Sequence, residues 1–217
     1  MPWIAMGLIG AAAFLAATAY HLPWLALATK GVPVVALLLW LRHAHATRYR
    51  LWISVGLAFS LLGDWLLAWP QDLFVFGLSA FFVAHLAYVR AYCTDCRQLA
   101  WPYLLLSSAF GVCMYSVLAH GGLGDLALPV AAYAAVISVM LWRALARLGS
   151  RETHQRSARL AAAGALLFVT SDSLIGIDRF VSMFTAAPYA IIVSYWLGQW
   201  AIAASTFSHK SRSLQSP

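Results

Sequence analysis

Three ionisable side chains lie inside long apolar stretches of this sequence. Asp64 lies in LAFSLLGDWLL, Asp172 in ALLFVTSDSLI, and Lys30 in LALATKGVPVV. Insertion scales put the cost of a charge in hydrocarbon at ~2.5–3.5 kcal/mol or more, so each group needs a reason to be there. A carboxylate is too costly to serve only as a hydrogen bond between helices, which Ser or Asn can supply. We therefore expect Asp64 and Asp172 to move protons, as in acid/base catalysis.

The composition places these side chains in a membrane. Hydrophobic residues make up 63% of the 217 residues and charged residues only 10%, too little polar surface for a soluble protein of this size. Apolar runs of about twenty residues without alternation favour helices, since only helices or closed barrels satisfy the backbone in lipid. We expect an all-α polytopic membrane protein with about eight transmembrane helices. The predicted spans are residues 3–20, 24–41, 51–69, 73–91, 101–119, 126–145, 159–177 and 187–207.

The basic residues predict the orientation of these spans. Twelve of the fourteen lysines and arginines follow alternate spans, and Arg179 is alone near the opposite connections. The positive-inside rule therefore puts both termini in the cytoplasm, with residues 1–207 as one transmembrane domain and residues 208–217 as a short cytoplasmic tail. A bacterial-type inner or plasma membrane is expected. The net charge of +7 is then explained by the basic residues of the cytoplasmic loops, and no nucleic-acid partner is predicted. Ala17-Thr18-Ala19 resembles a cleavage site, but without a basic segment before it we interpret residues 1–20 as the first span.

Several uncharged polar side chains accompany the three ionisable ones. Lys30, Asp64, Asp172 and Tyr133 are predicted at a similar depth, while His85 and Tyr88 are predicted somewhat deeper, past the midplane. Interhelical hydrogen bonding is an alternative role for each uncharged group. Candidates for substrate binding or for support of the two aspartates are Lys30, His85, Tyr88, Tyr133, Ser171, Tyr195 and Gln199.

Small residues predict which helix faces turn inward. Gly56, Ser60 and Gly63 share a face with Asp64, and Gly164, Phe168 and Ser171 share one with Asp172. Each aspartate also follows a glycine by eight positions, with 108 residues between the two aspartates. This weak repeat is consistent with two parallel four-helix halves, although similarity elsewhere is poor and chance is an equal alternative.

Two other motifs carry less weight. Cys93 and Cys96 form a lone CxxC without a second pair, so no metal, redox function or cofactor is expected. Gly122-Leu123-Gly124-Asp125 matches the GxGD signature of intramembrane aspartyl proteases but falls in a predicted loop. There the glycines can adopt positive φ and Asp125 can cap the following helix.

The sequence resembles the YhhN-type lysoplasmalogenases over about residues 25–205. The matching segments are Thr29-Lys30 with Pro33, FSLLGDWLL, FGLSAFFVAHLAY, GALLFVTSDSLI, and Tyr195 to Gln199. The resemblance implies an integral membrane hydrolase that cleaves the vinyl ether bond of a single-chain lysophospholipid. Its products would be a fatty aldehyde and glycerophospho-ethanolamine or -choline.

That chemistry needs an acid and a base together. A vinyl ether is protonated on carbon before water adds, so Asp64 and Asp172 are expected as the acid/base pair, in either order. Lys30 is expected either to hold the substrate phosphate or to act as a counter-charge. A proton-coupled transporter and a lipid-binding membrane protein are the alternatives, since buried carboxylates occur in both. The sequence leaves the oligomeric state open.

Overall fold

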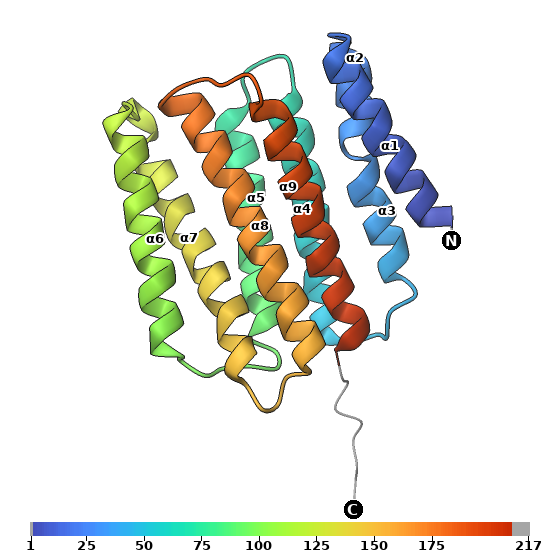
Figure 1. The fold of residues 1–217 in the computed structure, drawn as a ribbon, viewed down its shortest axis with the longest axis vertical. Coiled ribbons are helices and arrows are strands. Elements are labelled where there is room, and N and C mark those ends of the chain that lie inside the picture. Colours follow the sequence, from blue (N-terminus) through green and yellow to red (C-terminus); the bar gives the residue numbers. More distant parts are fainter. Residues whose placement is uncertain (1, 210–217) are drawn as a thin grey trace, which may run out of the picture.

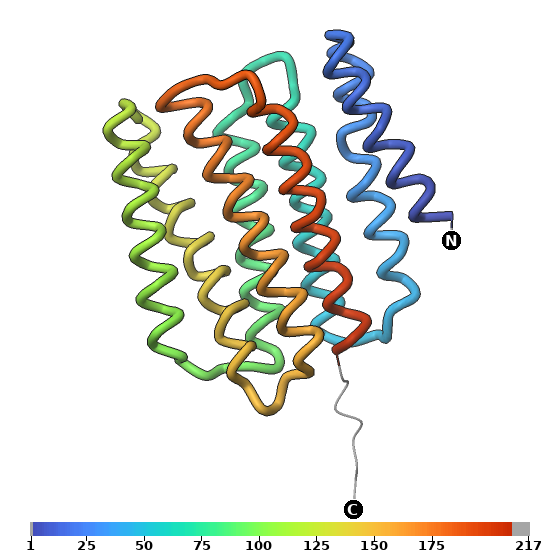
Figure 2. Tube along the Cα trace, viewed as in Figure 1, coloured from blue at the N-terminus to red at the C-terminus, as the bar shows by residue number. Residues whose placement is uncertain are grey.

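A computed structural model describes residues 2–209, and secondary structure over that range is entirely helical (Figures 1 and 2). The predicted tail at residues 208–217 therefore lies outside the described residues from residue 210 onward. The helices are α1 (Pro2–Ala19), α2 (Pro23–Lys30), α3 (Val32–Leu41), α4 (Arg48–Ala68), α5 (Phe74–Tyr92), α6 (Trp101–His120), α7 (Ala127–Ala146), α8 (Gln155–Phe180) and α9 (Ala187–Ala204). Short 3₁₀ turns are η1 (Gly124–Leu126), η2 (Arg147–Gly149) and η3 (Ser205–Ser208).

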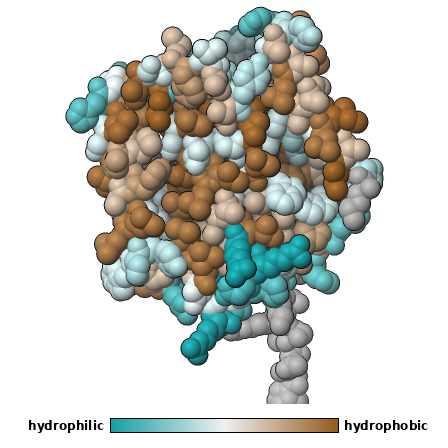
Figure 3. All heavy atoms as spheres, viewed as in Figure 1, coloured by the Kyte–Doolittle hydropathy of each residue, from teal (hydrophilic) through white to brown (hydrophobic). Residues whose placement is uncertain are grey.

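Eight helical segments are long and apolar enough to cross a bilayer, which confirms the predicted all-α membrane fold. One of the eight, Pro23–Leu41, comprises α2 and α3 together. Apolar side chains cover the middle of the face in Figure 3, and strongly hydrophilic side chains gather mainly at its lower end. The chain is therefore an integral membrane protein, and its orientation stays a prediction.

The second span is interrupted where Lys30 lies. The helix stops at Lys30 and resumes at Val32, with Gly31 between them. Pro33 causes this break, because its ring nitrogen carries no hydrogen to donate to the preceding turn. The predicted span from 24 to 41 therefore consists of two helices, and the break leaves Lys30 as the last residue of α2.

Five helices form a closed ring at the centre of the bundle. Helix α4 packs on α5, α5 on α7, α7 on α8, and α8 on α9, and α9 packs back on α4. Helix α6 lies outside the ring against α7 and α8, while α1, α2 and α3 form a separate layer beside α4 and α9 (Figure 1). A side chain on the inner face of any ring helix therefore meets side chains from several others.

Glycines bring the helices of the ring close together. A Cβ added at Gly56 would lie 2.2 Å from the ring of Tyr88 on α5. A Cβ added at Gly164 would lie 2.7 Å from the backbone oxygen of Gly198 on α9. These contacts confirm that the predicted small-residue faces of α4 and α8 point inward.

A buried polar network joins the loops at the end of the bundle that carries residue 209, here called the C-terminal end. Arg147 is fully buried and forms two hydrogen bonds to Asp95, at 3.0 and 2.8 Å. It also donates to Tyr49 and Ser157. The imidazole of His209 lies 3.2 Å from Asp95 and stacks on Tyr49. The sequence analysis counted Arg147 only as a loop charge, whereas its guanidinium ties four segments together.

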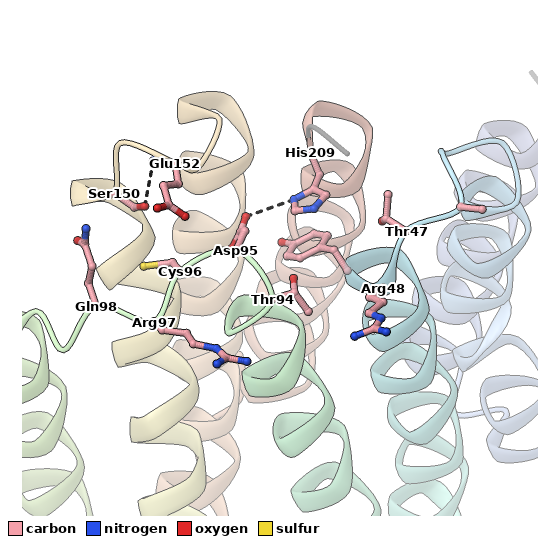
Figure 4. A pocket seen from close by; sticks show the side chains of 12 residues that line it. Thr47, Arg48, Thr94, Asp95, Cys96, Arg97, Gln98, Ser150, Glu152 and His209 are labelled. Atoms are coloured by element: carbon pink, nitrogen blue, oxygen red, sulfur yellow. Dashed lines mark hydrogen bonds and ion pairs between the residues drawn. The ribbon is translucent and has the colours of Figure 1, made fainter. Parts of the chain in front are cut away.

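Part of this network borders a polar cavity of about 880 Å³. Figure 4 shows Asp95 and His209 at its centre, with Arg48 and Arg97 at its sides. Arg143, also counted as a loop charge, lies in α7 and donates to the backbone oxygens of Cys96 and Gln98. The arginines at this end therefore differ in burial: Arg143 and Arg147 are buried and hydrogen-bonded inside the fold, whereas others are exposed.

The GxGD loop has the backbone expected of a turn. Gly122 and Gly124 adopt positive φ values of 96° and 51°. The expected cap by Asp125 is wrong, since α7 begins after Leu126 without a side-chain hydrogen bond. The 3₁₀ turn η1 starts the helix instead, and Asp125 lies exposed within it.

Replacing Gly164 with alanine should destabilise the ring. The added methyl group would overlap backbone atoms of α9, and overpacking of this kind costs about 1–3 kcal/mol. Gly149→Ala is the matched control, since nothing lies within 4 Å of its added Cβ. Thermal unfolding in detergent should show a lower Tm for Gly164→Ala alone; equal Tm values would contradict the close approach of α8 and α9.

The network at Asp95 should make stability depend on pH. Burial alone would raise the pKa of Asp95, but hydrogen bonds from His209 and Arg147 outweigh it and hold the pKa below its usual 3.8. A depressed pKa contributes stability that is present above the unfolded value and lost as pH falls through the folded value. The Tm should therefore fall as pH drops below about 4, and Asp95→Asn should remove that part of the profile.

Asp125→Asn, at an exposed loop position, is the control for the pH profile. It should leave the acid limb of the Tm curve unchanged. An acid limb that persists unchanged in Asp95→Asn would show that another carboxyl group controls it.

Candidate functional site

Asp64 lies in a closed polar site between α4, α9 and α2. Its side chain is buried, and its Oδ2 accepts a hydrogen bond of 2.7 Å from the hydroxyl of Tyr195. The Nζ of Lys30 lies 3.9 Å from Oδ1. Both carboxylate oxygens therefore face a donor or a cation. Of the two predicted roles for Lys30, this contact favours the counter-charge.

Asp172 has its own set of partners from α5 and α7. Its Oδ2 accepts a 2.5 Å hydrogen bond from the hydroxyl of Tyr133 and lies 3.3 Å from Nε2 of His85. The same Nε2 is 2.9 Å from the hydroxyl oxygen of Tyr133. Because the Tyr133 proton is directed to Asp172, we assign the proton of neutral His85 to Nε2. The Oδ1 of Asp172 has no hydrogen-bond partner among residues 2–209.

His85 reaches Asp172 although counting residues along α5 placed it deeper in the membrane. Helical side chains lean toward the N-terminus of their own helix. Helices α5 and α8 run in opposite directions within the ring (Figure 1), so the side chains of His85 and Asp172 lean toward one another. The side chains of His85 and Asp172 therefore meet even though the positions of the two residues along their helices differ.

Tyr88 and Gln199 form a third polar contact inside the ring. The hydroxyl of Tyr88 donates to Oε1 of Gln199 at 2.7 Å and lies 3.4 Å from the hydroxyl of Ser60. Ser171 is not part of these sites, because its hydroxyl donates to the backbone oxygen of Ile191 on α9. Ser171 thus joins two helices, whereas Tyr88 and Gln199 border the Asp64 site on the ring interior.

Aromatic rings fill the space between the two aspartate sites. The ring of Phe168 lies 4.8 Å from that of His85 and 5.4 Å from that of Tyr195, measured between centroids. Phe81 packs edge-on against both Phe168 and Tyr195. No hydrogen bond joins Asp64 to Asp172 in the described chain, but they are near enough to interact electrostatically. The sequence analysis did not single out Phe81, since an apolar residue in an apolar span gives no signal.

Two small apolar cavities, each of about 50 Å³, meet at Asp172. Four residues border both: Leu118, Val130, Tyr133 and Asp172. Neither cavity is lined by Asp64. Of the two carboxyl groups, Asp172 is therefore the one that an apolar molecule entering these cavities would contact.

The remaining reactive side chains form no further site of this kind. Cys93, Cys96 and Cys113 are free thiols. Within residues 2–209 no group of three His, Cys, Asp or Glu side chains is placed to hold a metal ion. The carboxyl groups, tyrosines, histidine and lysine of the candidate site are groups that can transfer protons.

Comparisons with known proteins identify the family of the chain. The chain is 36% identical to lysoplasmalogenase TMEM86B of Homo sapiens over 187 residues, which cover 85% of this chain and 76% of that protein. It is 35% identical to lysoplasmalogenase TMEM86A of Bos taurus, covering 84% of this chain and 78% of that protein. A lysoplasmalogenase of Mycobacterium tuberculosis is 36% identical, covering 74% and 62%. No solved structure matches the chain. The YhhN family matches residues 25–206, and the chain therefore belongs to the YhhN family.

Proposed function

We propose that this protein is a lysoplasmalogenase, which hydrolyses the vinyl ether bond of a single-chain alkenyl phospholipid inside the membrane. Its relatives named lysoplasmalogenase support this substrate class. The observation that carries the proposal is a carboxyl group, Asp172, that is only 11% exposed and borders apolar cavities in a membrane-spanning bundle. Each cavity has room for only a few methylene groups, so it can receive the alkenyl end of a lipid chain beside Asp172 without a water-filled channel.

The reaction requires a proton on carbon and then water. An acid protonates the β-carbon of the alkenyl group, which leaves an oxocarbenium ion at the carbon bonded to oxygen. Water adds to that carbon while a base accepts one of its protons. The resulting hemiacetal loses the glycerol oxygen as an alcohol, which releases a fatty aldehyde and the glycerophosphate product.

The contacts of the two aspartates support different roles in this reaction. Asp172 borders the cavities and has an oxygen, Oδ1, free to carry a proton, so we assign it as the general acid. Asp64 has Lys30 and Tyr195 beside its two oxygens, so we assign it as the carboxylate base. In this assignment Phe81 and Phe168, which separate the two sites, must move aside for the attacking water to reach both carboxyl groups. Tyr133 and His85 position Asp172 through the shared Oδ2.

The alternative of a proton-coupled transporter gains less support. Transporters with repeats commonly bind their cargo at interrupted helices in both halves. Here α2 and α3 are interrupted at Gly31, whereas α7, four spans later, is continuous from Ala127 to Ala146. One broken span therefore has no counterpart at the matching position.

Conservative changes at the two aspartates should abolish aldehyde release. Purified protein in detergent, given an alkenyl lysophospholipid, should release aldehyde in proportion to time and enzyme. Asp64→Asn and Asp172→Asn keep the size of each side chain but cannot exchange the proton, so each should lower kcat by at least about 100-fold. A coupled aldehyde dehydrogenase assay measures the product.

Asp125→Asn is the control for this assay and should retain full activity, because Asp125 is exposed in a loop. Full activity in both Asp64→Asn and Asp172→Asn would refute the acid/base assignment. Absence of aldehyde from every alkenyl lysolipid, with correctly folded protein, would refute the proposed function.

Removing the hydroxyl of Tyr133 should slow the reaction without unfolding the protein. Tyr133→Phe keeps the ring but loses the hydrogen bond to Asp172, and we expect kcat to fall about tenfold or more. KM and Tm should change little. Tyr189→Phe, at an exposed position on α9, is the matched control. A clear fall in Tm together with the fall in kcat in Tyr133→Phe would instead indicate a purely structural hydroxyl.

A further inference from the structure

Arg179 lies at the end of the bundle opposite residue 209, in the last turn of α8. Apart from Lys30, it is the only lysine or arginine of residues 2–209 near this end of the spans. Its guanidinium carbon lies 4.0 Å from the ring centroid of Phe74 and 5.8 Å from that of Phe180. Both rings line the cavity that reaches Asp172. Arg179 therefore lies beside the apolar cavity that reaches the candidate acid.

The helix itself aligns Arg179 with Asp172. The two residues are seven positions apart, so they lie on the same face of α8 and about 10 Å apart along its axis. Ile175 and Gly176 lie between them on that face and line the cavity. Seven bonds separate the phosphorus of an alkenyl lysophospholipid from the β-carbon of its vinyl ether, and these bonds, when extended, span most of this distance.

The present partner of Arg179 leaves it able to bind an anion. Its Nη2 lies 2.8 Å from Oδ2 of Asp72, but the two side chains are 36% and 68% exposed. An exposed ion pair of this kind is weak, since water and salt screen both charges. A guanidinium also matches a phosphate group with paired hydrogen bonds. A phosphate can therefore replace or join Asp72 at Arg179.

Lys30 is less suited to bind the phosphate. Its ammonium group already lies beside Asp64, and its side chain is only 16% exposed. A phosphate at Lys30 would bring a second negative charge next to the buried Asp64 carboxylate. The two charges would repel one another in a setting where water cannot screen them.

We propose that Arg179 binds the phosphate of a single-chain phospholipid whose vinyl ether lies at Asp172. The inference rests on the proposed function and names the head-group contact of the same site. The hydrocarbon chain then continues past Asp172 into the second cavity, between α6, α7 and α8. That cavity runs toward the middle of the spans, where it is lined by Met114, Ala134, Ile137, Leu141 and Val169.

The head-group contact is tested with two substrates that differ only in the phosphate. Native protein and Arg179→Gln are given an alkenyl lysophospholipid and the matching alkenyl glycerol. The kcat/KM for the phospholipid should fall about tenfold in Arg179→Gln, mainly through KM. The kcat/KM for the alkenyl glycerol should change less than about twofold.

Arg159→Gln is the matched control, since Arg159 is exposed near the other end of the same helix. It should change neither substrate. If Arg159→Gln lowers kcat/KM for the phospholipid as much as Arg179→Gln does, the effect is a general attraction of the phosphate to basic side chains. If Arg179→Gln lowers kcat/KM equally for both substrates, Arg179 has a structural role. Either result overturns the inference. Competition by inorganic phosphate at millimolar concentration would identify a soluble phosphate ligand and would also overturn it.

A binding assay separates this inference from the proposed function. An alkyl ether lysophospholipid, which has no vinyl group to cleave, should bind native protein about tenfold more tightly than Arg179→Gln. If native protein shows this difference but releases no aldehyde, the proposed function fails while the phosphate site stands. If aldehyde is released but binding does not depend on Arg179, the phosphate site fails alone.

The position of the chain is tested on two neighbouring residues of α7. Ala134 lines the second cavity, whereas Ala135 is exposed on the outer side of the helix. Ala134→Phe should lower kcat/KM for a long-chain substrate about tenfold and for a short-chain substrate much less, while Ala135→Phe should affect neither. An unchanged chain-length dependence in folded Ala134→Phe would place the chain elsewhere.

Discussion

A carboxylate surrounded by hydrocarbon must find partners inside the protein, and this constraint explains much of the bundle. Asp64 and Asp172 each accept a hydrogen bond from a tyrosine on another helix of the ring. Gly56 and Gly164 pack the other two faces of these helices closely, α4 against α5 and α8 against α9. The break at Gly31 adds Lys30 to the Asp64 site from outside the ring. The two carboxyl groups are therefore held in a ring whose helices are joined by close packing on one side and by hydrogen bonds on the other.

Hydropathy and small-residue patterns predicted the spans and the inward faces of α4 and α8. Those features follow from local chemistry, because apolar length and glycine spacing are visible in one helix at a time. The partners of each aspartate could not be predicted in this way. Counting residues along α5 did not predict the contact of His85 with Asp172, because it ignores the lean of side chains. The charge of Arg147 was used only to predict orientation, because its partner Asp95 lies in another loop.

The two most extensive helix pairs of the ring are α4 with α5 and α8 with α9. In each pair the first helix carries one candidate aspartate, with a glycine eight residues earlier packed against the second helix. This correspondence supports the predicted repeat, which stays a prediction. The partners of the aspartates differ nonetheless, since Asp64 faces a lysine and Asp172 a histidine. Two similar scaffolds can therefore hold carboxyl groups in unlike surroundings, as acid/base catalysis requires.

Asp64 lies four residues before the end of α4, and Arg179 lies one residue before the end of α8, both at the end away from residue 209. A lipid that places its phosphate at Arg179 must therefore come from the leaflet on that side alone. The water-soluble product would leave to the aqueous phase on the same side, while the aldehyde would stay dissolved in the bilayer. Under the proposed function, the asymmetric position of the site makes the protein selective for one half of the membrane.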